Sequence, residues 1–346
     1  MWWVPSENKG RKPPTLADAI EEVLRVAKQS GVTTIFTHMK AWGPGFRDDA
    51  SKWIARMQEV RDAGGRVYMD VYPYDSSGSD GNFVALPSWA IGGRPGDEYN
   101  DSRHDFRASL QETLKNPAKR EDLKGDIEHQ VTLKGGAENV RILDYHDQQY
   151  VGKSLAELMA KRGMGLAELV IALQMEGDPL RAGGAKMRSF SMSEKDIEAF
   201  YKLDWCATAT DGWVVLPEEA TGRAKFIGTN RRCFGSFPRR LAWYARDRHV
   251  DTLEHAVRSA SGLPALILGL TDRGRIAPGM KADVAVIDLA SLRDNTTFLE
   301  PNEYATGVNY LLVNCRFTID GGKRTLALTG RVLDPVGRPA KLPKTQ

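Results

Sequence analysis

Cysteine is rare in this sequence. Cys206, Cys233 and Cys315 are its only three, and they lie far apart along the chain. An odd number of widely separated cysteines excludes a disulfide framework and a cysteine-rich metal site, and it is typical of a reducing compartment. No apolar run approaches the length of a membrane span, and residues 1–5 lack the charged start of a signal peptide. We therefore expect a cytoplasmic protein without a membrane partner.

A strong charge of one sign is also absent. The formal net charge is +3 over 346 residues, which gives no reason to expect nucleic acid or an anionic membrane as a partner. The sequence contains no phosphate loop, no dinucleotide fingerprint and no HExxH motif. A hydrophobic fraction of 41% and a charged fraction of 27% are ordinary for a globular chain, and the length suits one large domain, or a large and a small one.

Strand-like and helix-like segments alternate in the first part of the chain. Strands are predicted at 32–37, 66–71 and 205–210, and helices at 15–30 and 51–63, the first of them capped by Thr15 with Asp18. Alternation of this kind favours a parallel sheet or a barrel. Further predicted elements are a strand at 140–143 and helices at 154–162, 238–248, 252–260 and 263–268, and one that Ser193 and Asp196 cap.

The pattern changes in two regions. From about 75 to 190 the alternation loosens, as expected of an inserted lid or subdomain between two strands of a sheet. After Leu270, glycines separate short apolar runs at 282–288, 310–315 and 316–320, which predict antiparallel strands. The sequence Asp320-Gly321-Gly322 favours a tight hairpin turn. The polar tail from Arg338 onward is expected to be mobile.

Asp211 follows the predicted strand 205–210 and precedes Gly212. An apolar run that ends in Asp-Gly predicts a buried strand with a carboxylate at its C-terminal end, where barrel enzymes carry their catalytic groups. Such a carboxylate can accept the proton of a metal-bound water and pass it to a leaving amine. A turn aspartate without a chemical role is an equally good interpretation of this residue by itself.

Histidine, lysine and tyrosine follow two other predicted strands. His38 and Lys40 come after the run 32–37, and residues two apart on a strand point to the same side. A neutral imidazole can bind zinc, although a lone histidine is more often structural, and an ammonium can bind an anionic group. Tyr72 and Tyr74 follow the run 66–71, where phenol rings are expected to line a pocket. The combined set is typical of metal-assisted hydrolysis.

Arginines are concentrated in the segment 229–239, which we expect to be a loop near the same end of the sheet. A guanidinium holds a carboxylate through two parallel hydrogen bonds. Arg240 follows directly after this segment. One or two of these four arginines, Arg231, Arg232, Arg239 and Arg240, could therefore bind a substrate carboxylate, while a solvated surface accounts for most of them.

Five segments carry a family resemblance. They are Thr37–Lys40, Asp70–Tyr74, Thr210–Gly212, Phe234–Arg239 and Asp272–Asp288. Together they resemble the amidohydrolase superfamily and, more closely, its N-acyl-D-amino-acid deacylases, or D-aminoacylases. The last segment is specific to the superfamily, where it leads into a β-sandwich beside the barrel. The Tyr-Pro-Tyr and Gly-Ser-Phe-Pro-Arg runs indicate the D-aminoacylase branch.

The resemblance implies an α/β fold. Residues 1–270 would form the second half of a TIM-like (β/α) barrel with the insertion at about 75–190, and residues 271–346 a C-terminal antiparallel β-sandwich segment. Family members also carry a His-x-His strand, which this sequence lacks, and Trp3 stands where a strand-five histidine is expected. We therefore expect a fragment or a truncated gene product, with the His-x-His strand encoded upstream.

The resemblance also implies roles for individual residues. His38 would be a metal ligand, Lys40 and Arg232 would contact the substrate carboxylate, Tyr72 would line the pocket, and Asp211 would shuttle the proton. Asn230 departs from the family pattern, which has histidine there. The implied cofactor is Zn²⁺, expected in the complete enzyme; because catalytic zinc usually takes three protein ligands and this chain offers one or two, its retention by the chain alone is in doubt.

The resemblance predicts hydrolysis of the amide bond of N-acyl (D-)amino acids to a carboxylate and a free amino acid. The expected partner is this small-molecule substrate. One alternative is a cyclic amidase similar to dihydroorotase or hydantoinase, although Lys40, Arg232 and the Tyr-Pro-Tyr run favour an open-chain substrate. The other is a non-catalytic remnant of an amidohydrolase that binds no metal.

Overall fold

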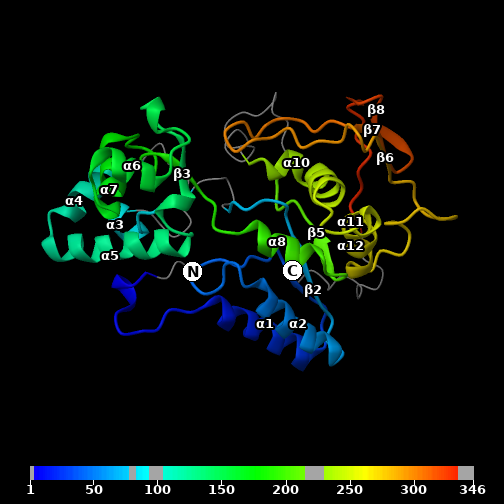
Figure 1. Ribbon diagram of the computed structural model, residues 1–346, viewed down its shortest axis with the longest axis horizontal. Coiled ribbons are helices and arrows are strands. Elements are labelled where there is room, and N and C mark those ends of the chain that lie inside the picture. The colour runs from blue at the N-terminus through cyan, green and yellow to red at the C-terminus, as the bar shows by residue number, and fades with distance from the viewer. Residues whose placement is uncertain (1–3, 78–82, 93–103, 215–229, 334–346) are drawn as a thin grey trace, which may run out of the picture.

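The computed structural model describes residues 4–77, 83–92, 104–214 and 230–333. Within them the fold is mixed α/β, with three separate sheets (Figure 1). One sheet has three parallel strands, one has two antiparallel strands, and one has four antiparallel strands. Trp3 and the tail from Arg338 onward lie outside the described residues.

The parallel sheet has the strand order β1-β2-β5. Its strands are β1 (Thr34–Phe36), β2 (Val67–Val71) and β5 (Cys206–Thr208). All three strands occur where the sequence predicts them, although β1 and β5 are shorter than expected. In the register, Thr34 pairs with Val67 and Met69 pairs with Cys206. The parallel arrangement that β/α alternation predicts is thereby confirmed.

Three helices pack against this sheet, namely α1 (Leu16–Ser30), α2 (Ala50–Asp62) and α8 (Glu194–Tyr201). The predicted capping pair is present at the start of α1, where Thr15 and Asp18 exchange hydrogen bonds in a capping box. Apolar residues at helical spacing bury one face of each helix. The resulting core includes Ile20, Leu24, Met57, Val60, Val67, Met69, Ile197 and Phe200.

Residues 83–92 and 104–189 build a largely helical part with its own hydrophobic core, on the left of Figure 1. Its elements are α3 (Ser88–Ile91), α4 (Phe106–Leu114), α5 (Pro117–Leu133), β3 (Val140–Asp144), α6 (Leu155–Arg162), α7 (Leu166–Glu176) and β4 (Lys186–Ser189). The predicted strand at 140–143 and helix at 154–162 are confirmed. Short 3₁₀ turns are η1 (Ser6–Asn8), η2 (Ala137–Asn139) and η3 (Gln148–Tyr150). The domain boundaries stay predictions.

The segment expected as a loop at 229–239 is largely a helix, and this expectation was wrong. Helix α10 (Arg232–Arg239) begins six residues before the predicted start at Pro238 and continues as the π-helix η5 (Arg240–Asp247). Proline usually marks a helix start because it lacks an N–H group. Here Pro238 lies near the end of α10, where the change to wider π-type turns follows it directly. The helices α11 (Leu253–Ala260) and α12 (Gly262–Ile267) come next, as predicted.

The third sheet lies at the C-terminal end of the described chain. Strands β6 (Val284–Ile287), β7 (Val308–Val313), β8 (Arg316–Asp320) and β9 (Lys323–Arg324) pair in sequence order, all antiparallel. Gly321 and Gly322, with φ of 55° and 78°, form the predicted turn between β8 and β9. That this sheet belongs to a sandwich, and the parallel sheet to a barrel, stays a prediction.

Cys206, Cys233 and Cys315 are all free. Within the described ranges, no helix has the length and apolar character that a membrane span requires.

Candidate functional site

The carboxyl ends of β1, β2 and β5 lie at one edge of the parallel sheet. Main-chain hydrogen bonds continue beyond the strands. The N–H of Met39 donates to the carbonyl of Asp70 at 2.9 Å, and the N–H of Ala209 donates to the carbonyl of Val71 at 3.0 Å. These bonds fix the segments that follow the three strands relative to one another, and the predicted site residues are all on or near those segments.

Asp211 makes a sharp turn just beyond the end of β5. Its φ of 47° lies in the left-handed region, which costs free energy in any residue other than glycine. A Cβ at Gly212 would lie 3.0 Å from the Cα of Cys233, so the turn packs tightly against α10. The turn brings Oδ2 of Asp211 to 3.0 Å from Nη1 of Arg232. The Asp211 side chain is 30% exposed and that of Arg232 only 3%, so the carboxylate faces solvent while the guanidinium is buried.

Two cations lie over the ring of Tyr72. Cζ of Arg232 is 5.1 Å from the ring centroid and Nζ of Lys40 is 4.9 Å from it, within the range of a cation–π contact. The Tyr72 hydroxyl donates to the carbonyl of Ser76 at 3.0 Å. Burial raises the pKa of the Tyr72 phenol, which therefore stays neutral. Lys40, Tyr72, Asp211 and Arg232, predicted from separate segments, thus come together.

Lys40 has a charge that depends on pH near neutrality. Burial lowers its pKa from 10.5 to about 8, and the nearby Asp211 carboxylate opposes that shift. Its ammonium also donates to the carbonyl of His38 at 3.0 Å. Lys40 is therefore charged at neutral pH and loses its charge in mildly alkaline solution.

His38 lies beside this group with an exposed side chain. Strand β1 ends at Phe36, so the alternation expected to carry His38 and Lys40 into one pocket does not extend to them. His38 instead has a φ of 44°, and its backbone N–H donates to Oδ1 of Asp70 at 2.7 Å. The sequence analysis gave Asp70 no role. Its position could have indicated a role, because Asp70 is a charged residue in an apolar strand, two residues before Tyr72.

The zinc site that the resemblance implies does not fit these residues. A catalytic zinc ion usually takes three protein ligands. Among the residues that the structure describes, no three His, Cys, Asp or Glu side chains come together as a ligand set. Asp211 is engaged by Arg232, and Asp70 accepts the N–H of His38. His38 is a candidate ligand without companions, so the described residues alone do not hold a catalytic zinc ion.

Asn230 stands where the resemblance expects histidine. Its side chain is buried, and Oδ1 accepts the backbone N–H of Arg232 at 3.3 Å. The residue thus helps to fix the start of α10.

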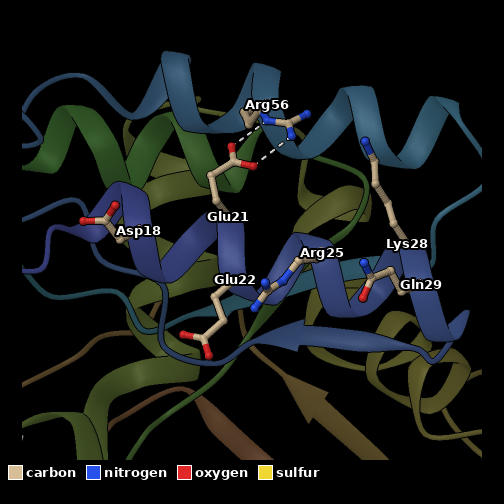
Figure 2. Close-up of a pocket in the computed structure, with 7 residues that line it drawn as sticks. All are labelled: Asp18, Glu21, Glu22, Arg25, Lys28, Gln29 and Arg56. Carbon is tan, nitrogen blue, oxygen red and sulfur yellow. Dashed lines mark hydrogen bonds and ion pairs between the residues drawn. The ribbon is translucent and has the colours of Figure 1, made fainter.

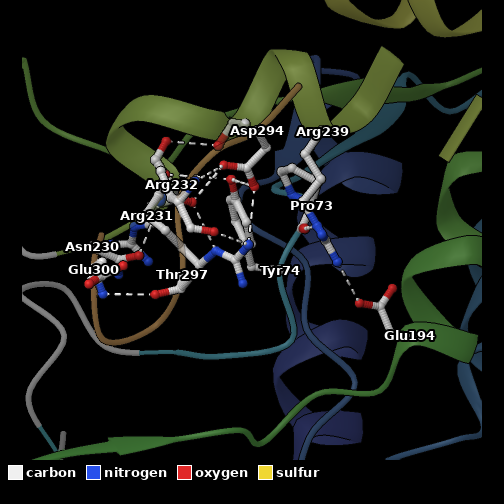
Figure 3. A network of polar contacts seen from close by, with 12 residues as sticks. Pro73, Tyr74, Glu194, Asn230, Arg231, Arg232, Arg239, Asp294, Thr297 and Glu300 are labelled. Atoms are coloured by element: carbon white, nitrogen blue, oxygen red, sulfur yellow. Dashed lines mark hydrogen bonds and ion pairs between the residues drawn. The ribbon is translucent and has the colours of Figure 1, made fainter. Parts of the chain in front are cut away.

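A second row of polar side chains lies behind the predicted site, and the sequence analysis missed its importance. Figure 3 shows Tyr74, Arg231 and Asp294 gathered beside Arg232 at the start of α10. The sequence gave two indications of this second row. Tyr74 is two residues from Tyr72, and Arg231 is next to Arg232. Asp294 comes from beyond β6, and no sequence pattern connects it with the others.

A separate hollow lies on the outer side of α1 and α2 (Figure 2). It is lined by Asp18, Glu21, Glu22, Arg25, Lys28, Gln29 and Arg56. An exposed ion pair crosses it, with Nε of Arg56 2.6 Å from Oε1 of Glu21. None of the predicted site residues lines this hollow, and a solvated helix face explains its composition.

Comparison with known proteins agrees with the sequence motifs. A sequence profile of the amidohydrolase family matches residues 223–325. An N-acyl-D-glutamate deacylase of Alcaligenes xylosoxydans xylosoxydans is 28% identical over 296 residues, which are 86% of this chain and 47% of the relative. A D-aminoacylase of the same organism is 33% identical over 163 residues, 47% of this chain and 30% of the relative. The chain resembles the N-acyl-D-amino-acid deacylases. It spans less than half the length of these two deacylases, and the resemblance is to their C-terminal part.

Solved deacylase structures have a similar fold. A crystal structure of D-aminoacylase matches with a TM-score of 0.60 and 24% identity, over 92% of this chain and 53% of that one. The N-acyl-D-glutamate deacylase of Bordetella bronchiseptica, solved with zinc and a phosphonate inhibitor, matches with a TM-score of 0.57 and 24% identity, over 88% of this chain and 51% of that one. The mixed α/β arrangement is therefore that of a deacylase, over about half of its length.

Proposed function

We propose that this chain carries the substrate-binding and proton-transfer part of a metal-dependent N-acyl-D-amino-acid deacylase. The supporting observation is the group formed by Lys40, Tyr72, Asp211 and Arg232 at the carboxyl edge of the parallel sheet. In this proposal β1, β2 and β5 belong to a TIM-like barrel within residues 1–270, and β6–β9 belong to a β-sandwich. The substrate is a small N-acyl amino acid, and the products are a carboxylate and a free amino acid.

Two cations would hold the substrate carboxylate. Arg232 offers a planar fork of donors, which suits a carboxylate. Lys40 supplies a second charge over the same Tyr72 ring, and the ring limits where both cations can lie. Arg232 is paired with Asp211 in this structure. A substrate carboxylate that binds Arg232 would take over this pairing and release the Asp211 carboxylate for proton transfer.

Asp211 would then move the proton. As a base it accepts a proton from the attacking water, and as an acid it delivers that proton to the nitrogen of the scissile amide, so that the amine can leave. The partial exposure of the Asp211 side chain allows contact with water and substrate.

Hydrolysis of matched N-acetyl amino acids tests the proposal. The chain, joined to the N-terminal half of a deacylase relative, is incubated with N-acetyl-D-leucine, N-acetyl-L-leucine and dihydroorotate, with zinc supplied and with zinc chelated. Release of free amine from the acetyl amino acids and ring opening of dihydroorotate are measured. Preferential hydrolysis of the D compound is expected when zinc is present. Opening of the cyclic amide alone would instead favour a dihydroorotase-like or hydantoinase-like enzyme.

A non-catalytic remnant is the second candidate, favoured by the lack of a three-ligand cluster in the described residues. Metal analysis and turnover of the joined protein separate it from the first. A chain whose joined form binds zinc but hydrolyses none of these compounds would be the remnant.

A further inference from the structure

Asp294 lies behind the two adjacent arginines at the start of α10, on the loop after β6. Its Oδ2 accepts the Tyr74 hydroxyl at 2.9 Å and Nη2 of Arg231 at 3.2 Å. Its Oδ1 accepts the hydroxyl and the N–H of Thr296 at 2.6 and 3.0 Å. Both carboxylate oxygens are therefore fully used, and the side chain is only 6% exposed. A buried carboxylate with four donors has one well-defined position.

Arg231 is held as firmly as Asp294. Besides its ion pair, Nε donates to the Thr296 hydroxyl at 3.1 Å and Nη2 donates to the Thr296 carbonyl at 2.9 Å. Its guanidinium lies 4.6 Å from the centroid of the Tyr74 ring. The segment 294–296 thus fixes the residue that directly precedes Arg232.

The two arginines repeat one arrangement. Arg232 lies over Tyr72 and pairs with Asp211, while Arg231 lies over Tyr74 and pairs with Asp294. Tyr72 and Tyr74 are two residues apart after the end of β2. The first arrangement belongs to the proposed substrate site. The second lies next to it, where Tyr74, Arg231 and Asp294 gather beside Arg232 (Figure 3).

Close packing completes the contact between Asp294 and α10. A Cβ at Gly235 would overlap the Asp294 carboxylate and would lie 2.5 Å from the Tyr74 hydroxyl. Asp294 therefore lies directly against the first turn of α10, the turn that carries Arg232.

We infer that Asp294 is a positioning residue, which sets the place of Arg232 for a substrate carboxylate through Arg231, Tyr74 and the first turn of α10. The inference rests on the proposed function and adds to it a residue from the C-terminal region of the chain. Asp294 touches neither substrate nor water in this role. It acts on carboxylate recognition and not on proton transfer.

The test compares binding of two probes. N-acetyl-D-leucine carries the α-carboxylate, and N-isopentylacetamide is the same molecule without it. Isothermal titration calorimetry on the full chain gives the ratio of their affinities. Asp294→Asn is expected to reduce this ratio by roughly ten-fold, the size of effect that loss of a supporting partner has in other sites. Asp288→Asn removes the same charge on an exposed residue at the end of β6 and is expected to leave the ratio unchanged.

Two further variants keep the test decisive. Tyr74→Phe removes one donor to Asp294 with little change of shape, and it should shift the ratio in the same direction if Asp294→Asn fails to fold. In a double-mutant cycle with Arg232→Lys, the loss caused by Asp294→Asn should largely vanish, because both changes act on one cation. Fully additive effects, or an unchanged ratio in folded Asp294→Asn and Tyr74→Phe, overturn the positioning role. A wild-type chain without preference for the carboxylate overturns the proposed function, and the positioning role with it.

Discussion

Asp211 combines a buried ionic partner with a carboxylate that reaches solvent. Turn aspartates usually satisfy their own loop, as Asp147 and Asp178 do here through N–H groups two residues further along the chain. Asp211 instead pairs with the side chain of Arg232, 21 positions later, from a left-handed backbone conformation. Strain of this kind persists where the surrounding structure imposes it, and functional sites are common among such places.

Replacement of Asp211 by Asn is expected to lower kcat by ~10²–10⁴-fold in a preparation that hydrolyses N-acyl-D-amino acids, because Asn can neither accept nor deliver the proton. Steady-state kinetics measures the change. Asp204→Asn, two residues before β5 and 89% exposed, is the matched control. Near-normal kcat in Asp211→Asn would remove the residue from the mechanism, and loss of folding would return it to a structural role.

Lys40 gives a prediction about pH. Its pKa of about 8 lies below the ordinary value of 10.5 because of burial. The ammonium is therefore present below about pH 8 and is lost as the pH rises through that value, and carboxylate binding should weaken with it. We expect kcat/KM for an N-acyl amino acid, which reports the free enzyme, to fall above about pH 8. Lys40→Arg keeps its charge throughout this range and should abolish the fall. The same fall in that variant would assign it to another group.

At the scale of elements, α10 is the most informative. The sequence predicts that the arginines of α10 lie near the site, but it does not predict that they lie on a helix. Gly235 and Pro238 both disfavour a helix interior. Tertiary contacts override this preference. Asp294 and Tyr74 need the space beside Gly235, and the Asn230 side chain fixes the helix start.

Glycine-to-alanine changes in two helices should have opposite effects. In a helix, alanine is favoured over glycine by about 0.5–1 kcal/mol. Gly125→Ala in α5, where no atom lies within 4 Å of an added Cβ, should raise the free energy of unfolding by that amount. Gly235→Ala should lower it by about 1–3 kcal/mol, because the overlap with Asp294 outweighs the propensity gain. Urea denaturation measures both. A Gly235→Ala variant with a higher free energy of unfolding than the wild type would show that α10 can move away from Asp294 without loss of stability.

At the scale of the whole molecule, apolar surface is exposed on the antiparallel sheet, at the upper right of Figure 1. Val286, Tyr310 and Phe317 are 46%, 39% and 45% exposed. They form one patch, because Val286 pairs with Tyr310 across the strands and the rings of Tyr310 and Phe317 lie 5.9 Å apart. In the described part of the chain, β1 and β5 are also edge strands of their sheet. Exposed apolar surface and open strand edges both favour association.

The purified chain is therefore expected to self-associate. Sedimentation velocity over a range of concentrations should show oligomers, and Phe317→Thr should reduce them. Leu180→Thr removes an apolar side chain of similar exposure, 39%, outside this patch, and should have little effect. A monodisperse monomer that melts sharply and cooperatively would contradict the prediction.

The local elements and the chemistry at their ends follow from the sequence alone. Three features depend on only a few neighbouring residues each and were predicted correctly. They are the capping box at Thr15, the apolar run before Asp211 and the Gly-Gly turn after β8. That Lys40, Tyr72 and Asp211 lie near one another was predictable, because parallel strands deliver their carboxyl ends to one edge. The choice of Arg232 came from the family resemblance.

The way in which those residues are held depends on tertiary contacts. The pairing of Asp211 with Arg232, the helical conformation of α10, and the support of Arg231 by Asp294 depend on side chains 21 or more positions apart. Burial likewise exists only in the folded chain, and it lowers the pKa of Lys40 and raises that of Tyr72. Sequence spacing carries no information on such contacts, since they arise when separate elements pack against one another.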